Sequence, residues 1–233
     1  MTALLASHDL RKTFVGGDGQ PVDVLSGVDL AVRRGEFVAI VGASGAGKST
    51  LLHLLGALDR PSGGEVVLDG TRYGALGDRA LDAIRGQRIG FVFQFHHLLR
   101  EFTALENVMF PLLIHGTTPA VARDRAEAVL ARVGLAPRCT HRPPELSGGE
   151  QQRCAVARAI VHEPAVLLAD EPSGNLDHHN SERLHDLLVG LVRELETAAV
   201  VVTHNRHLAE RADRILLLED GRLHAATAEE AMS

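Results

Sequence analysis

The feature that most limits what this chain can fold into is the glycine-rich stretch Gly42–Thr50, which lies between two apolar segments. The run Glu36–Val41 before it has the length and composition of a buried strand, and Thr50–Leu58 after it is typical of a helix. The spacing GxxxxGK[ST] in this context predicts a phosphate-binding loop, because backbone N–H groups converge on an anion at the positive end of the helix dipole. The loop residues are Gly42, Ala43, Ser44, Gly45, Ala46, Gly47, Lys48, Ser49 and Thr50.

Two side chains of this loop indicate a nucleotide bound with magnesium. Lys48 can reach the β- and γ-phosphates of ATP, and the hydroxyl of Ser49 can bind Mg²⁺. The alternative is a glycine-rich turn that opens an ordinary helix. It is disfavoured because the lysine, the hydroxyl and both flanking segments agree with a phosphate loop. We therefore expect an ATPase with ATP and Mg²⁺ as cofactors.

Two carboxylates follow a second buried strand. The apolar run Ala165–Ala169 leads directly into Asp170 and Glu171, at the edge where open parallel sheets bind ligands. We expect Asp170 to hold Mg²⁺, directly or through water, and Glu171 to orient and polarise the attacking water. Such an acidic pair on its own is more often a solvated turn, but the phosphate loop in the same chain favours catalysis.

The alternation of short apolar strands, loops and helices predicts an α/β domain with a mainly parallel core sheet. Apolar runs such as Ala199–Thr203 are suited to strands that are covered on both faces. Three N-terminal segments have the pattern of strands joined by glycine-rich turns, so a small antiparallel sheet is expected beside the core. They are Leu4–Asp9, Val22–Val32 and Gly64–Asp69.

A region of different character interrupts the strands and is expected to be helical. Its clearest helical segments are Thr103–Met109 and Ala120–Val133, and the turn Arg142-Pro143-Pro144 closes it. We predict one domain over residues 1–233. Residues 1–94 and 146–233 would form the nucleotide-binding core with its β-subdomain, and residues 95–145 an inserted helical subdomain.

The composition disfavours several classes of function. Apolar residues make up 45% of the 233 residues, which is ordinary globular composition, and the net charge of −6 argues against a nucleic-acid groove as the main working surface. No apolar run approaches the ~20 residues that span a bilayer, and the N-terminal stretch lacks a secretory pattern. Cys139 and Cys154 show neither metal-ligand spacing nor a disulfide framework, which fits a reducing cytosol. Membrane contact is expected through partners only.

A second candidate anion site lies at Ser147-Gly148-Gly149-Glu150. Ser147 and Glu150 have the spacing of a capping box at the start of a helix that continues through Gln151–His162. Each glycine costs up to about 1 kcal/mol relative to alanine in a helix, which makes sense if an anion must approach the backbone closely. A well-capped helix remains the alternative. One phosphate loop supplies one nucleotide site, so a second anion site in the same chain suggests that Ser147-Gly148-Gly149 binds the nucleotide of a partner copy.

These motifs occur in the order found in the ATP-binding subunits of ABC transporters, which the chain resembles from about Leu4 to Leu223. The phosphate loop resembles their Walker A loop, and Val166–Glu171 resembles their Walker B strand with its catalytic glutamate. Leu146–Gln151 resembles their signature motif. By the same resemblance, a D-loop at the dimer interface consists of Ser173, Gly174, Asn175, Leu176 and Asp177.

Three further residues receive roles only through this resemblance. Gln94 follows the strand Ile89–Phe93, like the family's glutamine that contacts Mg²⁺ and the attacking water. His204 follows Ala199–Thr203, like the family's histidine that senses the γ-phosphate. Phe14 stands where an aromatic ring stacks on adenine, although tyrosine is commoner there. Order and spacing favour function for Gln94 and His204, whereas a core position for Phe14 stays an alternative.

The resemblance implies a homodimer in the ATP-bound state. Each nucleotide would lie between the Walker A loop of one copy and Ser147, Gly148 and Gly149 of the other, until hydrolysis weakens the pair. It also implies two membrane-spanning partner subunits and a peripheral position on the cytoplasmic face of a bacterial inner membrane.

Three stretches resemble the ATPases of lipoprotein-releasing systems more closely, namely Leu51–Asp59, Phe93–Val108 and His141–Glu150. Such a system takes lipoproteins from the inner membrane and passes them to a periplasmic carrier. Family geometry places the segment after Gln94 against the membrane subunit, with filling of the helical core as the alternative for its apolar side chains. This chain departs from the sequence pattern of those ATPases at Arg100, Ser173 and Asn205.

Alternative functions remain open at this point. Within the family they are ATPases of macrolide-efflux or cell-division complexes, and a soluble non-transport ATPase. A DNA-repair ATPase is expected to carry coiled-coil or zinc insertions, and a translation factor two fused cassettes. A small kinase that shares only the phosphate loop would lack LSGGEQQR and the later histidine.

Overall fold

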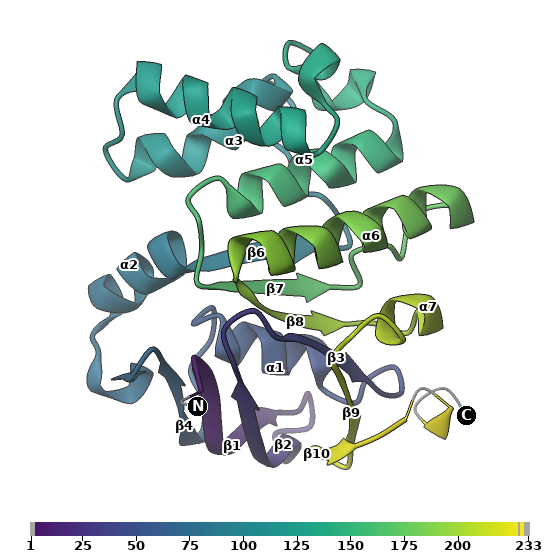
Figure 1. The fold of residues 1–233 in the computed structure, drawn as a ribbon. Coiled ribbons are helices and arrows are strands. Elements are labelled where there is room, and N and C mark those ends of the chain that lie inside the picture. Colours follow the sequence, from purple (N-terminus) through teal and green to yellow (C-terminus); the bar gives the residue numbers. More distant parts are fainter. Residues whose placement is uncertain (1–2, 228, 231–233) are drawn as a thin grey trace.

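A six-stranded sheet forms the centre of the computed structural model, which describes residues 3–227 and 229–230 (Figure 1). Its strand order is β10-β9-β3-β8-β7-β6, and all neighbours pair in parallel except β10, which is antiparallel to β9. This arrangement confirms the predicted α/β fold with a mainly parallel core sheet. The strands are β3 (Phe37–Val41), β6 (Ile89–Phe93), β7 (Val166–Asp170), β8 (Ala198–Val202), β9 (Arg214–Glu219) and β10 (Arg222–Ala225).

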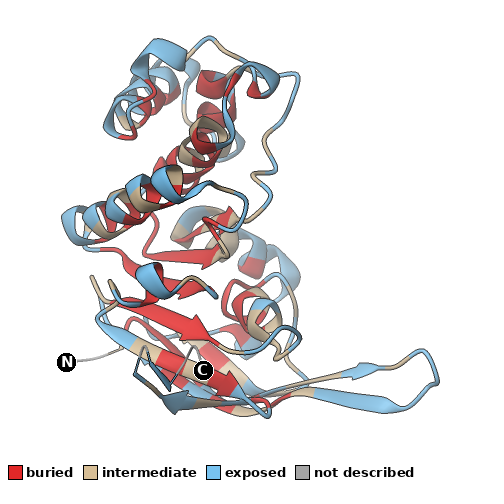
Figure 2. Cartoon of the chain, turned by 90° about the vertical axis from the view of Figure 1, so that its right-hand side faces the viewer, coloured by how far each residue is buried: buried red, intermediate tan, exposed pale blue. Residues whose placement is uncertain are grey.

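A four-stranded antiparallel sheet lies beside this core, in the order β2-β1-β4-β5. Its strands are β1 (Leu5–Val15), β2 (Pro21–Val32), β4 (Gly63–Leu68) and β5 (Thr71–Arg72). β1 continues six residues beyond the predicted end at Asp9, whose φ of 44° accompanies a register shift between Ser7 and Leu10. This bulge interrupts the alternation that marks a strand in sequence. The outer halves of β1 and β2 extend from the body as an exposed hairpin (Figure 2).

The central strands separate two hydrophobic cores. Along β7, Val166 and Leu168 pack with the antiparallel sheet, whereas Leu167 and Ala169 pack with helices on the opposite face. All four side chains are at most 1% exposed. Because successive side chains of a strand point to opposite faces, a strand covered on both sides must be apolar throughout.

The helices are distributed over both faces of the core sheet. They are α1 (Lys48–Leu55), α2 (Asp78–Arg88), α3 (Ala104–Ile114), α4 (Pro119–Arg132), α5 (Gly148–Ile160), α6 (His178–Leu195) and α7 (Arg206–Ala209). Short 3₁₀ turns lie at Tyr73–Ala75, Ala136–Arg138 and Pro143–Glu145. α3 and α4 lie at the far end from the antiparallel sheet, and α5 joins them to the core sheet (Figure 1). Among the residues described, every helix is too short or too polar to span a bilayer.

The helix after the phosphate loop differs from its predicted range. α1 ends at Leu55 rather than Leu58, because Gly56 closes it and Ala57 has a φ of 55°. A Cβ at Gly56 would lie 2.0 Å from the ring of Phe91, so no side chain fits between this turn and β6. α3 extends five residues beyond its predicted end at Met109 and contains Pro111.

The tight contact between Gly90 of β6 and the backbone of α5 gives a test of this packing. A Cβ at Gly90 would lie 2.3 Å from the carbonyl oxygen of Ala159, and neither backbone can move aside without disturbing the core. We expect Gly90→Ala to lower the free energy of unfolding by about 1–3 kcal/mol, the usual cost of overpacking, as measured by urea titration.

Gly190→Ala is the matched control, because Gly190 lies within α6 and a Cβ there meets nothing within 4 Å. Removing a helical glycine should raise the free energy of unfolding by about 0.5–1 kcal/mol. Equal effects of the two substitutions would refute the packing argument.

Candidate functional site

One cavity of about 570 Å³ gathers the predicted catalytic and magnesium-binding residues together with most of the phosphate loop. Its walls come from the phosphate loop and from the carboxyl ends of β6, β7 and β8, which parallel pairing places at the same edge of the sheet. The lining residues are Val24, Gly42, Ser44, Gly45, Gly47, Lys48, Ser49, Thr50, Gln94, Asp170, Glu171 and His204. The volume suits a ligand of the size of a nucleotide.

Two glycines fix the path of the phosphate loop between β3 and α1. Gly42 has a φ of 152°, and a Cβ there would lie 2.4 Å from the carbonyl oxygen of Leu218. Gly47 is the N-cap of α1 with a φ of 96°, and a Cβ there would lie 2.8 Å from Val24. At each position a side chain is disfavoured by the positive φ and would also clash with neighbouring atoms. The loop therefore curls against neighbouring strands with its backbone open to the cavity.

Lys48 supplies the positive charge of the cavity. Its Nζ donates hydrogen bonds to the carbonyl oxygens of Gly42 and Ala43, at 2.8 and 2.9 Å. These contacts hold the ammonium group over the loop, beside the N-terminus of α1. The loop, the lysine and the helix end together form an environment suited to a polyanion.

Asp170 and Glu171 lie next to each other but face different surroundings. Asp170 ends β7 and pairs with Phe93 on one side and Val202 on the other. Glu171 has a φ of 45°, and its backbone N–H donates to the carbonyl of Val202 at 2.9 Å. A positive φ is uncommon for a non-glycine residue, and here it accompanies the turn from β7 into the following loop.

The Glu171 carboxylate is held by His204 from the end of β8. The Nδ1 atom of His204 lies 2.8 Å from Glu171 Oε1, and the backbone N–H of His204 donates to Oε2 at 3.2 Å. The Glu171 side chain is 15% exposed, whereas that of His204 is 70% exposed. Both carboxylate oxygens are thus oriented by one exposed residue.

Gln94 meets the predicted D-loop in a reciprocal pair of hydrogen bonds. Gln94 Nε2 donates to Asn175 Oδ1 at 3.1 Å, and Asn175 Nδ2 donates to the carbonyl of Gln94 at 3.0 Å. A Cβ at Gly174 would lie 2.9 Å from Gln94 Nε2, so the glycine allows the close approach. The segments after β6 and β7 are therefore held together beside the cavity.

Ser147 and Glu150 form the predicted capping box at the start of α5. Ser147 Oγ accepts from the Glu150 N–H at 3.3 Å, and Glu150 Oε2 accepts from the N–H and Oγ of Ser147 at 2.9 and 2.8 Å. Arg138 Nε donates to Glu150 Oε1 at 3.1 Å. The hydrogen bonds from Ser147, with a smaller contribution from Arg138, lower the pKa of Glu150 to about 2. Glu150 is therefore ionised throughout the physiological range.

The glycines of this motif have different environments. A Cβ at Gly149 would lie 2.7 Å from Asn180 Oδ1 on α6, so close packing explains this glycine without any ligand. Gly148 is exposed, and the nearest atom to a Cβ there is Leu176 Cδ2 at 3.8 Å. The unfavourable helix propensity of glycine therefore argues for an anion site only at Gly148. Ser147, Gly148 and Gly149 are not among the described residues that line the cavity of the phosphate loop.

Three apolar side chains, for which a buried position in the core was the alternative interpretation, lie at the surface. Phe14 is 43% exposed on the projecting hairpin, and Lys12 Nζ lies 4.9 Å from the centroid of its ring. Phe95 and Leu99, after Gln94, are 66% and 40% exposed. Core filling is therefore wrong for these three residues, whereas Leu98 does pack partly against the core. Adenine stacking by Phe14 stays a prediction.

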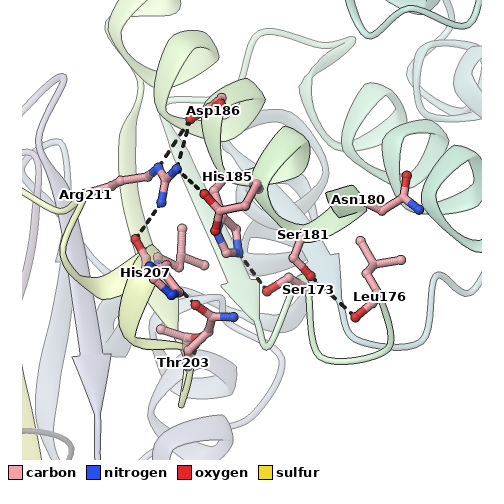
Figure 3. A network of polar contacts seen from close by, with 12 residues as sticks. Ser173, Leu176, Asn180, Ser181, His185, Asp186, Thr203, His207 and Arg211 are labelled. Carbon is pink, nitrogen blue, oxygen red and sulfur yellow. Dashed lines mark hydrogen bonds and ion pairs between the residues drawn. The ribbon is translucent and has the colours of Figure 1, made fainter. Parts of the chain in front are cut away.

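Sequence reasoning missed two groups near the site. Val24 of β2 lines the cavity and contacts the position of Gly47. His185 of α6 is completely buried, and its Nε2 lies 2.9 Å from Ser173 Oγ in the D-loop (Figure 3). Neither residue belongs to a motif, so only the folded arrangement reveals its proximity.

Comparison with known proteins agrees with the geometry. A family model described as "ABC transporter" matches residues 25–174. The chain is 50% identical over 222 residues to the "Lipoprotein-releasing system ATP-binding protein LolD" of Legionella pneumophila (strain Lens), covering 95% of this chain and 97% of that protein. A protein of the same description from Xanthomonas oryzae pv. oryzae (strain MAFF 311018) is 54% identical, with 95% and 91% covered. A solved dimeric ATP-binding cassette, in a post-hydrolysis state with ADP and Pi, superimposes with a TM-score of 0.86 at 39% identity, covering 94% of this chain and 96% of that one.

Lys48 offers a test that separates binding from folding. Its hydrogen bonds go to carbonyls of a largely exposed loop, so Lys48→Met should change the free energy of unfolding by less than about 1 kcal/mol. The wild-type protein should gain about 2.7 kcal/mol from MgATP at a hundred times its Kd, and the variant should lose most of this gain. Thermal unfolding with and without MgATP measures both effects. Arg123→Met on α4 is the control, and an equal loss there would contradict the assignment.

Proposed function

The chain belongs to the ABC transporter family of ATP-binding proteins, and from this premise we propose that it powers the release of lipoproteins from a bacterial inner membrane toward a periplasmic carrier. As an ABC ATPase it hydrolyses ATP, and the hydrolysis is coupled to transport. The identity of 50–54% over about 95% of the chain to lipoprotein-releasing ATP-binding proteins supports the class of cargo.

The observation that carries the proposal is the cavity between the phosphate loop and the carboxyl edge of the parallel sheet. It brings Lys48 of the phosphate loop together with Asp170, Glu171, Gln94 and His204, which are separated by up to 156 positions in the chain. These groups combine phosphate binding with a carboxylate that can act on water.

Within this cavity we assign the phosphates to the backbone N–H groups of the loop and to Lys48. Glu171 would then orient and polarise the attacking water, because it follows the carboxyl end of β7 and lines the cavity. His204 positions that carboxylate through its two contacts with Glu171. Phosphoryl transfer depends mostly on such positioning and on charge stabilisation, so the rigid strand ends serve it well.

The donor set of the cavity fits magnesium. Ser49 offers a hydroxyl, Gln94 an amide oxygen and Asp170 a carboxylate, and all three line the same cavity. Oxygen ligands of this kind, with phosphate oxygens and water completing the shell, are what Mg²⁺ prefers. When bound, the ion would neutralise charge that develops on the phosphates, and these three residues would hold it.

The signature motif supports a dimer as the working state. Ser147, Gly148 and Gly149 do not line the cavity of their own chain, yet Ser147 and Gly148 are exposed at a helix N-terminus, where a polyanion is favoured. A second copy that faces the first could place these groups against its nucleotide. The solved cassette that resembles this chain is itself a dimer.

We assign the chain to the cytoplasmic face of the inner membrane, where two membrane-spanning subunits would hold it. The exposed Phe95 and Leu99, one and five residues after Gln94, are suited to such a contact because they are large apolar side chains. A movement at Gln94 could thus reach the partner subunit.

Glu171→Gln tests the catalytic assignment. The amide keeps the size of the side chain but removes the base, so the variant should bind ATP, lose at least about a hundredfold in kcat, and accumulate as a dimer in excess ATP. Turnover assays and size-exclusion chromatography with light scattering measure these effects. Glu163→Gln, before the opposite end of β7, is the control. Near-normal turnover, or a monomer in excess ATP, would count against the assignment.

The same variant tests the cargo. In proteoliposomes that contain the native membrane partners, wild-type protein with ATP should release lipoprotein to an added carrier, and Glu171→Gln should not. ATP turnover without any lipoprotein release would leave the ATPase intact and reject this cargo.

Ser147→Arg tests the clamp between copies. The large cation should block the approach of a partner's γ-phosphate, so the variant should bind ATP as a monomer and lose more than about tenfold in kcat. Ser147→Ala is the control, since it removes the helix cap at a cost of about 1 kcal/mol without blocking the surface. If the arginine variant hydrolyses ATP as well as the alanine variant, the motif is only a helix cap.

A further inference from the structure

A completely buried histidine on α6 contacts the loop that follows the catalytic carboxylate (Figure 3). His185 Nε2 lies 2.9 Å from Ser173 Oγ, and Ser173 is itself only 5% exposed. A buried polar pair of this kind must be satisfied internally, so each side chain fixes the position of the other. Neither group touches the cavity of the phosphate loop.

The surroundings of His185 favour a proton on Nδ1, although Nδ1 and Glu182 Oε1 lie too far apart for a hydrogen bond. Nδ1 faces Glu182 Oε1 at 3.6 Å, and Arg211 holds the other oxygen of Glu182 at 2.6 Å. A carboxylate favours a proton on the nitrogen that faces it, which leaves Nε2 free to accept from the Ser173 hydroxyl. Burial, reinforced by the nearby charge of Arg211, lowers the pKa of His185 to about 4. The imidazole is therefore neutral at physiological pH and can accept this hydrogen bond.

Ser173 lies in the tight turn between Glu171 and Asn175. The N–H of Gly174 donates to the carbonyl of Glu171 at 3.0 Å, and the N–H of Leu176 donates to the carbonyl of Ser173 at 3.1 Å. Asn175 in turn binds Gln94 through two hydrogen bonds. A displacement of Ser173 would therefore reach both Glu171 and Gln94 through short, hydrogen-bonded connections.

The same part of α6 also holds the segment that follows His204. Arg211 binds Glu182 and, at 3.3 Å, Asp186, while its Nη1 donates to the carbonyl of His207 in α7 at 2.9 Å (Figure 3). α6 thus anchors the loop after β7 and the segment after β8 within one turn of helix.

We propose that His185 is a positioning residue for ATP hydrolysis, which holds Ser173, and through it the D-loop and Glu171, in the arrangement that acts on the nucleotide. The inference rests on the proposed function, because it assigns the D-loop and Glu171 to hydrolysis. His185 acts through Ser173 and touches neither nucleotide nor water.

Steady-state kinetics of the full chain test the proposal. His185→Leu should lower kcat about tenfold and leave the KM for ATP within about twofold, because the phosphate loop is untouched while the carboxylate loses its alignment. His185→Gln should recover most of the kcat, since its amide can reach the place of Nε2 and bind Ser173. Ser173→Ala should lose as much as His185→Leu, and the double variant should lose no more than either single one.

Ser181→Ala is the matched control, because Ser181 also joins α6 to the D-loop but only by a long bond of 3.5 Å to the carbonyl of Leu176. It should change kcat by less than about twofold. Ser173→Ala decides the matter if His185→Leu fails to fold, since it leaves the imidazole in place. An unchanged kcat in Ser173→Ala, or losses that multiply in the double variant, would overturn the proposal.

A pH measurement separates a neutral imidazole from a charged one. Glu182 and Asp186 on α6, Arg211 and His207 from the α7 region, and Ser173 are the polar groups that surround it. The unfolded chain takes up a proton near pH 6.5 and the folded chain only near pH 4, so the stability from this residue is complete above 6.5 and is lost as the pH falls toward 4. Between pH 7 and 5, the Tm of wild-type protein should fall more than that of His185→Gln. An equal fall in both proteins would contradict the neutral imidazole and overturn the proposal.

The outcomes distinguish a failure of this proposal from a failure of the proposed function on which it rests. If Glu171→Gln abolishes turnover and His185→Leu does not alter kcat, the positioning role fails and the ATPase assignment stands. If Glu171→Gln keeps its turnover, the assignment of Glu171 fails, and with it the reason for any role of His185.

Discussion

Parallel pairing of the central strands is the constraint on which the site depends. Phe93 pairs with Asp170, Asp170 with Val202, and Val202 with Ile40, so the three strands and β3 end at nearly the same level. The residues that follow each strand must then meet at one edge, although they lie far apart in the sequence. A register slip of one residue would turn every side chain to the opposite face and expose both cores. The apolar packing that stabilises the fold therefore also fixes the geometry of the site.

Two charged side chains of the site, those of Lys48 and Glu171, already have partners within the chain, and this shapes how a nucleotide can act. Lys48 binds carbonyls of its own loop, and the carboxylate of Glu171 binds His204. A polyanion must compete with the first set of contacts, and a water molecule with the second. Since these contacts are exchanged rather than created from free groups, the net gain from ligand binding is smaller than the new contacts alone suggest. The exchange also gives ATP a means of favouring one arrangement of Glu171 and His204 over another.

The sequence predicted those parts in which local pattern and final structure coincide. The phosphate loop has a residue pattern tied to one backbone path, and β7 and β8 are apolar throughout because both of their faces are buried. β1 appeared shorter than it is, because a bulge at Asp9 breaks its alternation. α6 begins with the polar run His178–Glu182, which masks its amphipathic character. The role of His185 depends on the turn of α6 that places it under Ser173, and no spacing along the chain reveals that contact.

The capping box of α5 shows that a structural role and an anion site do not exclude each other. Ser147 Oγ accepts from the Glu150 N–H, and its own proton points to Glu150 Oε2. The cap needs only the first of these bonds, so the hydroxyl proton can turn toward a partner's phosphate while the helix keeps its start. The nearby negative charge of Glu150 would oppose that phosphate, but Arg138 offsets part of it at 3.1 Å. Because Gly149 is required by packing against Asn180, the exposed backbone of Gly148 is the part of the motif that an incoming anion can use.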